Sequence, residues 1–206
     1  MTAQTPLRNA AVVVPLALIN SAGYLLLNQY HLRAPIELPL SPLDRAIPFV
    51  AWTMWPYLVL MLLDVVVPLA LRDRQVFRET IFAYVVAIAL NFVFWTLLPT
   101  TYPRPAPPSG DSITEAAFRI MVSVDSPASC FPSGHITIPA VACWGFVREH
   151  PKLRLVVWVI FLLFSLTVLT TKQHYVADIL GGLGTALVGV IAAQRWAARQ
   201  PDAAVG

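Results

Sequence analysis

The stretch "LRLVVWVIFLLFSLTVLTT" (residues 153–171) contains a single charged side chain, that of Arg154. A helix needs about 20 mostly apolar residues to cross a bilayer. This stretch is therefore predicted to span a membrane, and it decides the fold class. Outward from it, five further apolar segments are predicted as spans. These segments are residues 9–29, 48–70, 77–98, 133–149 and 175–197, of which 133–149 is the shortest and carries Pro139.

The composition supports a membrane protein. Of the 206 residues, 57% are hydrophobic and 12% are charged, whereas a soluble domain has about 25% charged residues. We expect an all-α, polytopic membrane protein with six transmembrane helices and one domain over residues 1–206. A net charge of +3 is too small and too dispersed to predict a nucleic-acid partner. Cys130 and Cys143 make no disulfide framework and are expected to be small buried side chains.

The distribution of lysine and arginine predicts the orientation. Six spans place both termini on one side, and nine of the 14 basic residues lie on that side. The positive-inside rule then puts the termini in the cytoplasm. We therefore expect a plasma (inner) membrane protein whose loop 99–132 faces outward. The nine residues are Arg8, Arg72, Arg74, Arg78, Arg148, Lys152, Arg154, Arg195 and Arg199.

The predicted outer loop 99–132 has two parts. "TYPRPAPPSG" (residues 101–110) is rich in proline and predicts extended chain. "SITEAAFRIMVSV" (residues 112–124) predicts a short amphipathic helix on the membrane surface. Its apolar side is expected to hold Ile113, Ala116, Ala117, Ile120, Met121 and Val124, opposite Thr114, Glu115 and Arg119.

A candidate phosphate site lies in "CFPSGHITIP" (residues 130–139). Ser133 and Gly134 stand where the fourth span begins, and a helix N-terminus offers free N–H groups and a positive dipole end. Gly134 lets the backbone approach a ligand, and Ser133 adds a hydroxyl donor. His135 then lies beside this pocket as an acid/base group.

Two further segments complete the set. In "TTKQHYVADILGG" (residues 170–182), His174 and Asp178 are four residues apart on one helix face, and a carboxylate there fixes the imidazole tautomer. Lys172 lies one turn away. In "PTTYPRP" (residues 99–105), Arg104 can bind phosphate oxygens in a fork. The six-span topology brings all these groups to the outer face, at the boundary between membrane and water.

Together these segments resemble the type 2 phosphatidic acid phosphatase superfamily, which also includes the vanadium haloperoxidases. The first motif of that family ends in Arg-Pro, which is matched by Arg104-Pro105. The second is Pro-Ser-Gly-His, matched at residues 132–135. The third ends in a His followed four residues later by Asp, matched by His174 and Asp178.

The resemblance implies a mechanism on a lipid phosphate, with no metal and no other cofactor. His174 would attack phosphorus and form a phosphohistidine, and Asp178 would hold His174. His135 would protonate the leaving oxygen and later activate water. The phosphoryl oxygens would be held by Arg104, Ser133 and the Gly134 N–H.

The chain departs from the family pattern at two cations. The family has a Lys seven residues before the Arg of the first motif, where this chain has Leu97, and an Arg six residues before the His of the third, where it has Val168. Lys172 is expected to replace one of them, with Arg45 or Arg119 as candidates for the other. "LDRAIPF" (residues 43–49), "DSPASCFPSGH" and "TKQHY" resemble the branch of inositol phosphorylceramide synthases.

Three functions stay open at this point. The first is an integral-membrane lipid phosphatase. The second is a phosphotransferase that moves a phospho-headgroup to a lipid hydroxyl through the same phosphohistidine. The third is a transporter or scaffold without catalysis. Against the third, the spans hold few polar groups near the membrane midplane, namely Asn20, Asp64 and Asn91.

Other polar and aromatic residues are expected to have structural roles. Asp64 is predicted to pair with Arg72 or Arg74 at the inner end of the second span, and Asp44 with its neighbour Arg45. The aromatic residues Trp52, Trp55, Tyr57 and Trp95 are predicted to serve as an interface belt or as packing.

Overall fold

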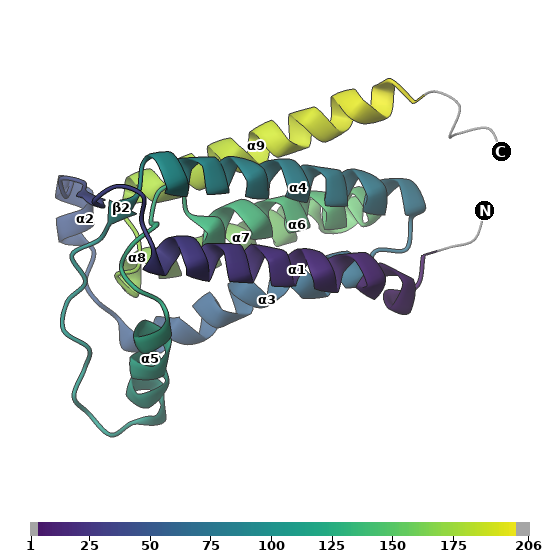
Figure 1. The fold of residues 1–206 in the computed structure, drawn as a ribbon. Helices are drawn as coiled ribbons and strands as arrows, with labels where there is room; N and C mark the ends of the chain where they lie inside the picture. The colour runs from purple at the N-terminus through teal and green to yellow at the C-terminus, as the bar shows by residue number, and fades with distance from the viewer. Residues whose placement is uncertain (1–3, 201–206) are drawn as a thin grey trace.

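Long helices lie side by side in the computed structural model, which describes residues 4–200 (Figure 1). Both ends of the described chain lie at one end of the bundle, and the loops that carry the predicted site lie at the other. The α-helices are α1 (Pro6–Gln29), α2 (Pro42–Ala46), α3 (Met54–Ala70), α4 (Arg74–Leu97), α5 (Ile113–Val124), α6 (Gly134–Glu149), α7 (Arg154–Ser165), α8 (Thr167–Thr170) and α9 (Val176–Ala198). Short 3₁₀ helices, η1 (Ala51–Thr53) and η2 (Pro151–Leu153), precede α3 and α7.

Five helical segments in the described chain are long and apolar enough to cross a membrane, so the protein is an integral membrane protein. They are Pro6–Gln29, Ala51–Ala70, Arg74–Leu97, Pro151–Thr170 and Val176–Ala198. The predicted fourth span is α6, which has 16 residues and rises only about 24 Å. The structure therefore supports five of the six predicted spans, and α6 is shorter than a typical spanning helix.

The shorter helix α6 lies at the centre of the bundle. It packs against α3, α4, α7 and α9, and ten of its residues are buried. Small side chains such as Ala140 and Ala142 allow this close packing. A helix enclosed by protein needs less length to satisfy its surroundings than a helix that faces lipid. The position of α6 is important for the site, because His135 stands in its first turn.

The predicted fifth span is interrupted near the end that carries the site loops. Helix α7 ends at Ser165, and α8 begins at Thr167. The hydroxyl of Thr167 donates across this break to the backbone carbonyl of Phe164, a bond that competes with regular helix hydrogen bonding. The break redirects the chain toward the loop that carries His174.

The predicted helix 112–124 is present as α5 and projects from the long helices at the end of the bundle opposite the termini (Figure 1). Ser112 and Glu115 form a capping box at its N-terminus. Its most buried side chain is Phe118, which the predicted apolar side did not include and which packs edge-on against Phe49. The Arg119 guanidinium donates to carbonyls of the proline-rich loop and so ties that loop to α5.

Short parallel strands connect the loops at the end of the bundle opposite the termini. Strand β1 (Ile36–Glu37) pairs with β2 (Thr100–Thr101), and Thr101 also forms a bridge with Ala128. The hydroxyl of Tyr175 donates to the carbonyl of Thr101 (2.9 Å). These contacts connect the loops before α2, after α4 and before α6 to the loop before α9.

Candidate active site

Two histidines and an aspartate form the centre of the site. His135 stands in the first turn of α6, His174 in the loop before α9, and Asp178 in the first turn of α9. His135 Nδ1 lies 3.0 Å from His174 Nε2, and His174 Nδ1 lies 3.1 Å from Asp178 Oδ2. His174 and Asp178 are in contact, as predicted, but they do not share a helix face, because His174 precedes the N-cap residue Tyr175 and Asp178 reaches back to it from the first turn of α9.

The Asp178 carboxylate lies at one end of this set. With both imidazoles neutral, it determines the direction of each hydrogen bond. A carboxylate only accepts, so Nδ1 of His174 carries the proton that it donates to Asp178. Nε2 of the neutral His174 then has a free lone pair and accepts from Nδ1 of His135. Nε2 of His135 in turn accepts from the Tyr57 hydroxyl at 3.2 Å. The result is a chain of donors from Tyr57 to Asp178.

The first turn of α6 offers donors without partners. Ser133 is the N-cap of α6, yet its buried Oγ has no hydrogen-bond partner within residues 4–200. The amides of Gly134 and His135 belong to the first turn, which has no intrahelical carbonyl to receive them. A Cβ on Gly134 would lie 3.1 Å from the Trp95 ring. Glycine therefore allows the Trp95 ring to pack against the start of α6, while the free amides of this turn can receive an anion.

A close approach of α9 to α6 sets the distance between the histidines. The Ser133 N–H donates to the carbonyl of Asp178 (3.1 Å). A Cβ on Gly182 would lie only 2.7 Å from the Ser133 carbonyl oxygen, so a larger residue at Gly182 would push the two helices apart. The third motif is thereby held directly against the second.

Arg104 lies at the same end of the bundle and is bound to Asp125. Its guanidinium donates to Asp125 Oδ2 at 2.9 Å and also to the Asp125 carbonyl. The Tyr24 hydroxyl donates to the other carboxylate oxygen of Asp125. The Arg104 Nε is buried without a partner. The charge of the predicted phosphate-binding arginine is therefore partly neutralised by Asp125. Its Nε–H group remains free to bind an anion.

The structure does not bring the three proposed replacement cations into this site. The Lys172 ammonium donates to the carbonyls of Asp44 (3.1 Å) and Ile47, and its backbone has a positive φ of 55°. Arg119 is bound to the proline-rich loop. Arg45 is exposed on α2. Lys172 thus fastens the loop before His174 to the α2 segment.

Asp44 is a residue whose role the sequence did not reveal. It makes no ion pair with Arg45, contrary to the prediction, because its carboxylate accepts from the Val176 N–H (2.8 Å) and from the Ser41 N–H and hydroxyl (2.9 and 2.6 Å). Burial alone would raise the pKa of Asp44, but these hydrogen bonds lower it below its ordinary value. Asp44 therefore holds the first turn of α9.

Tyr57, Tyr24 and Asp125 were also missed as site residues. Tyr57 was predicted to belong to an interface belt or to packing, yet it is buried and donates to His135. No sequence motif marked Tyr24, which lies 101 positions from Asp125 and 111 positions from His135. The signal that could have found Asp125 is its place in the segment "DSPASCFPSGH" that precedes the second motif.

One group of side chains has the spacing of metal ligands. Ligand atoms of Cys130, His174 and Asp178 lie within 4.8 Å of one another. Burial raises the pKa of the Cys130 thiol well above its ordinary value, and a metal needs the thiolate. The thiol instead donates to the Pro127 carbonyl (3.2 Å). Cys130 and Cys143 are both free and buried, as predicted.

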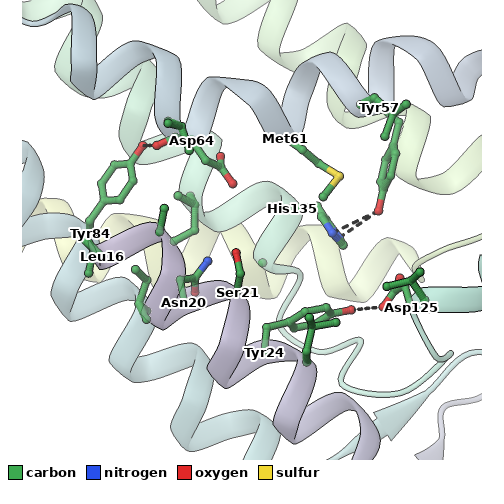
Figure 2. Close-up of a pocket in the computed structure, with 18 of the residues that line it drawn as sticks. Leu16, Asn20, Ser21, Tyr24, Tyr57, Met61, Asp64, Tyr84, Asp125 and His135 are labelled. Atoms are coloured by element: carbon green, nitrogen blue, oxygen red, sulfur yellow. Dashed lines mark hydrogen bonds between the residues drawn. The ribbon is translucent and has the colours of Figure 1, made fainter. Parts of the chain in front are cut away.

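A cavity of about 600 Å³ opens beside His135 and runs between α1, α3, α4 and α6 (Figure 2). Its lining extends along α1 from Val13 to Leu25, which is about 18 Å of helix. His135, Tyr24 and Asp125 lie toward one end, and Asp64 and Tyr84 toward the other. Most of the wall between them is aliphatic. This shape suits a long apolar group that ends at the histidines.

Asp64 faces this cavity and makes no salt bridge within the described chain, which corrects the predicted pairing with Arg72 or Arg74. Its Oδ1 is buried without a hydrogen-bond partner. Arg72 contacts a different carboxylate, since its backbone N–H donates to Glu149 (2.8 Å). Asp64 lies about two turns before the end of α3, so its short side chain does not reach the basic loop.

A family model described as the PAP2 superfamily matches residues 29–192, which is most of the chain and includes every site residue predicted from the sequence. A search of curated proteins finds no match.

Proposed function

Because the chain belongs to the PAP2 superfamily, we propose that it is a lipid phosphatase that hydrolyses a phosphomonoester or pyrophosphate through a phosphohistidine on His174. Membership in the superfamily implies metal-independent phosphatase activity on phosphomonoesters. One observation carries the proposed mechanism, namely the donor chain from Tyr57 through His135 and His174 to Asp178.

The first step uses the free lone pair on Nε2 of His174. This nitrogen attacks phosphorus, a P–N bond forms, and the P–O bond to the leaving group breaks. His135, protonated when the anionic phosphate is bound, gives one proton to the leaving oxygen and returns to its neutral form. Asp178 stabilises the positive charge that develops on His174. The free donors of Ser133, Gly134 and Arg104 bind the phosphoryl oxygens, because charge grows there in the transition state.

The second step restores the enzyme. His135, now neutral, takes a proton from a water molecule, and the water oxygen attacks phosphorus. The P–N bond breaks, and inorganic phosphate leaves. The 3.0 Å contact between the histidines leaves no room for a phosphoryl group. Substrate binding must therefore part them and compete with Asp125 for Arg104.

The cavity beside His135 supports a lipid as the substrate. A chain in this cavity would lie along the bundle axis with its phosphate at the histidines. We place this end of the bundle at the outer boundary between membrane and water, with the termini in the cytoplasm, since most basic residues lie at the opposite end. In this arrangement α6 is the sixth crossing segment.

Phosphate transfer to a lipid hydroxyl is the second candidate. His135 lines an apolar cavity, so an alcohol that enters through the membrane can reach the phosphohistidine and give its proton to His135. The segments that resemble inositol phosphorylceramide synthases favour the same reaction. The two functions differ in one product, since hydrolysis releases free phosphate and transfer does not.

The test is phosphate release by purified protein in detergent, with and without His174→Ala. Phosphatidic acid, phosphatidylglycerophosphate and undecaprenyl pyrophosphate form the substrate panel. We expect release from at least one lipid and none from the variant. Well-folded protein that releases phosphate from none of them would contradict hydrolysis of this panel and favour transfer. Equal release by His174→Ala would contradict the assigned nucleophile.

A further inference from the structure

Three polar side chains face the cavity away from the histidines. Oδ1 of Asp64 is buried without a partner. Asn20 and Ser21 project from α1 into the same cavity (Figure 2), and neither side chain makes a hydrogen bond to another residue in the range 4–200. Tyr84 donates to the backbone carbonyl of Asp64 (3.1 Å) and leaves its carboxyl group free.

Unpaired polar groups are costly at this depth. The cavity lies among membrane-spanning helices, where a buried polar atom without a partner, such as Oδ1 of Asp64, loses its hydration and gains nothing in return. Asn20 is half-buried and Ser21 is exposed, so both remain free to contact a ligand. Met61 and Val65 offer no hydrogen bond to Asp64, and the Tyr84 hydroxyl is occupied by the Asp64 carbonyl. A bound group that both donates and accepts would satisfy Asp64 and one of the two α1 side chains.

The polar cluster and the candidate active site lie along one helix. Tyr57, which contacts His135, and Asp64 are seven residues apart on α3, or two turns and about 10 Å. Both line the same cavity. A ligand with its phosphate at the histidines and an extended chain in the cavity therefore passes the cluster about 10 Å from its phosphorus.

We propose that Asp64, Asn20 and Ser21 form a polar subsite that binds a hydroxyl group on the aliphatic chain of the substrate. This inference rests on the proposed function, since it assumes that the chain ends in a phosphate at His135 and His174. A hydroxyl donates to the Asp64 carboxyl group and accepts from Asn20 or Ser21. A cationic group would only donate, and its burial would cost more.

The test measures binding of two alkyl phosphonates of equal chain length to the full chain in detergent micelles. One is unsubstituted, and the other carries a hydroxyl about 10 Å from phosphorus along the extended chain. Phosphonates have a P–C bond in place of the ester, so their binding is independent of turnover. The ratio of the two dissociation constants is the readout, which removes the general effect of chain hydrophobicity.

We expect wild type to favour the hydroxylated phosphonate, by about tenfold relative to the ratio for Asp64→Leu. Asp64→Asn keeps the size and a hydrogen-bonding group and should retain part of the preference. Met61→Leu is the matched control, because it changes an apolar wall residue of the same helix. It should alter both dissociation constants alike.

Equal ratios for wild type and Asp64→Leu would overturn the subsite and would mean that water alone fills it. Failure of both phosphonates to bind wild type would also overturn it, because the cavity would then hold no such chain. Hydrolysis is measured separately on lipid phosphates. Retained discrimination without any hydrolysis would contradict the proposed phosphatase and leave the subsite in place.

Discussion

At the scale of single residues, the candidate site combines motif residues with positioning groups from distant parts of the chain. His135, His174 and Asp178 stand in segments whose spacing already implies contact. Tyr57 and Asp44 come from parts of the chain 78 and 132 positions away from their partners. A contact of that kind depends on how the helices pack, and no local pattern in the sequence records it.

Replacement of Asp178 by Asn tests the fixed tautomer of His174. The Asn amide can donate to Nδ1, which would move the imidazole proton to Nε2 and remove the attacking lone pair. We expect kcat to fall by at least about 100-fold with little change in KM. The control is Asp111→Asn, which makes the same substitution at an exposed position in the loop between β2 and α5. Activity of Asp178→Asn near that of this control would contradict the role of Asp178.

Replacement of Tyr57 by Phe removes one hydroxyl and keeps the ring. The lost bond to Nε2 of His135 holds the imidazole in place, so we expect kcat to fall by about tenfold at nearly constant KM. Tyr84→Phe is the matched control, because Tyr84 lines the far end of the same cavity. If both variants keep full activity, Tyr57 does not position His135.

At the scale of secondary-structure elements, the sequence predicted where the long helices lie, because long apolar runs leave few alternatives. The short elements were harder. Helix α2 has five residues, too few for an apolar period, and its contact with α9 could not be read from the sequence. The break between α7 and α8 depends on threonine hydroxyls that bond the backbone, and a hydropathy pattern does not register such bonds.

The contact between α2 and α9 leads to a prediction about Asp44→Asn. The variant loses charge-assisted hydrogen bonds to Val176 and Ser41, so we expect a Tm lower by a few degrees and a lower kcat, because the His174 loop loosens. Asp73→Asn is the matched control. Asp73 caps α4 at the opposite end (2.8 Å to the Val76 N–H), so its loss should lower Tm without a change in kcat.

The same carboxylate sets a pH dependence. The pKa of Asp44 is lower in the folded protein than its ordinary value of 3.8. Its contribution to stability is therefore complete above that value and is lost as pH falls through the folded pKa. Tm of wild type should drop more steeply than that of Asp44→Asn below about pH 4. Parallel Tm profiles would show that the Asp44 carboxylate does not stabilise the fold.

At the scale of the whole molecule, composition and charge predicted a membrane protein with its site loops at one end. The cavity could not be predicted, because it exists where α1 packs loosely. Helix α1 is the least buried of the five spanning segments, and the cavity lies between it and α3. The sizes of gaps between helices depend on many side chains at once. The short length of α6 also depends on packing, since a helix of 16 residues is tolerated here because its neighbours in the bundle enclose it.

Orientation is testable with single cysteines at opposite ends. Ser109→Cys places a thiol on the exposed proline-rich loop, and Lys152→Cys places one on η2. The native cysteines are buried and should stay unlabelled. On intact cells, a membrane-impermeant maleimide should label Ser109→Cys alone, and permeabilised cells should show both. Labelling of Lys152→Cys alone on intact cells would reverse the proposed orientation.

The most direct test of the whole account is to trap the phosphoenzyme. His135→Ala lacks both the group that protonates the leaving oxygen and the group that activates water. A lipid pyrophosphate has a phosphate leaving group that needs no proton, so the variant incubated with one labelled on its terminal phosphate should still form the phosphoenzyme and accumulate label. We predict an acid-labile label that peptide mapping places on His174 and that His135→Ala/His174→Ala lacks. Label on another residue, or phosphate release by wild type without any label on His174 under rapid quench, would contradict the account.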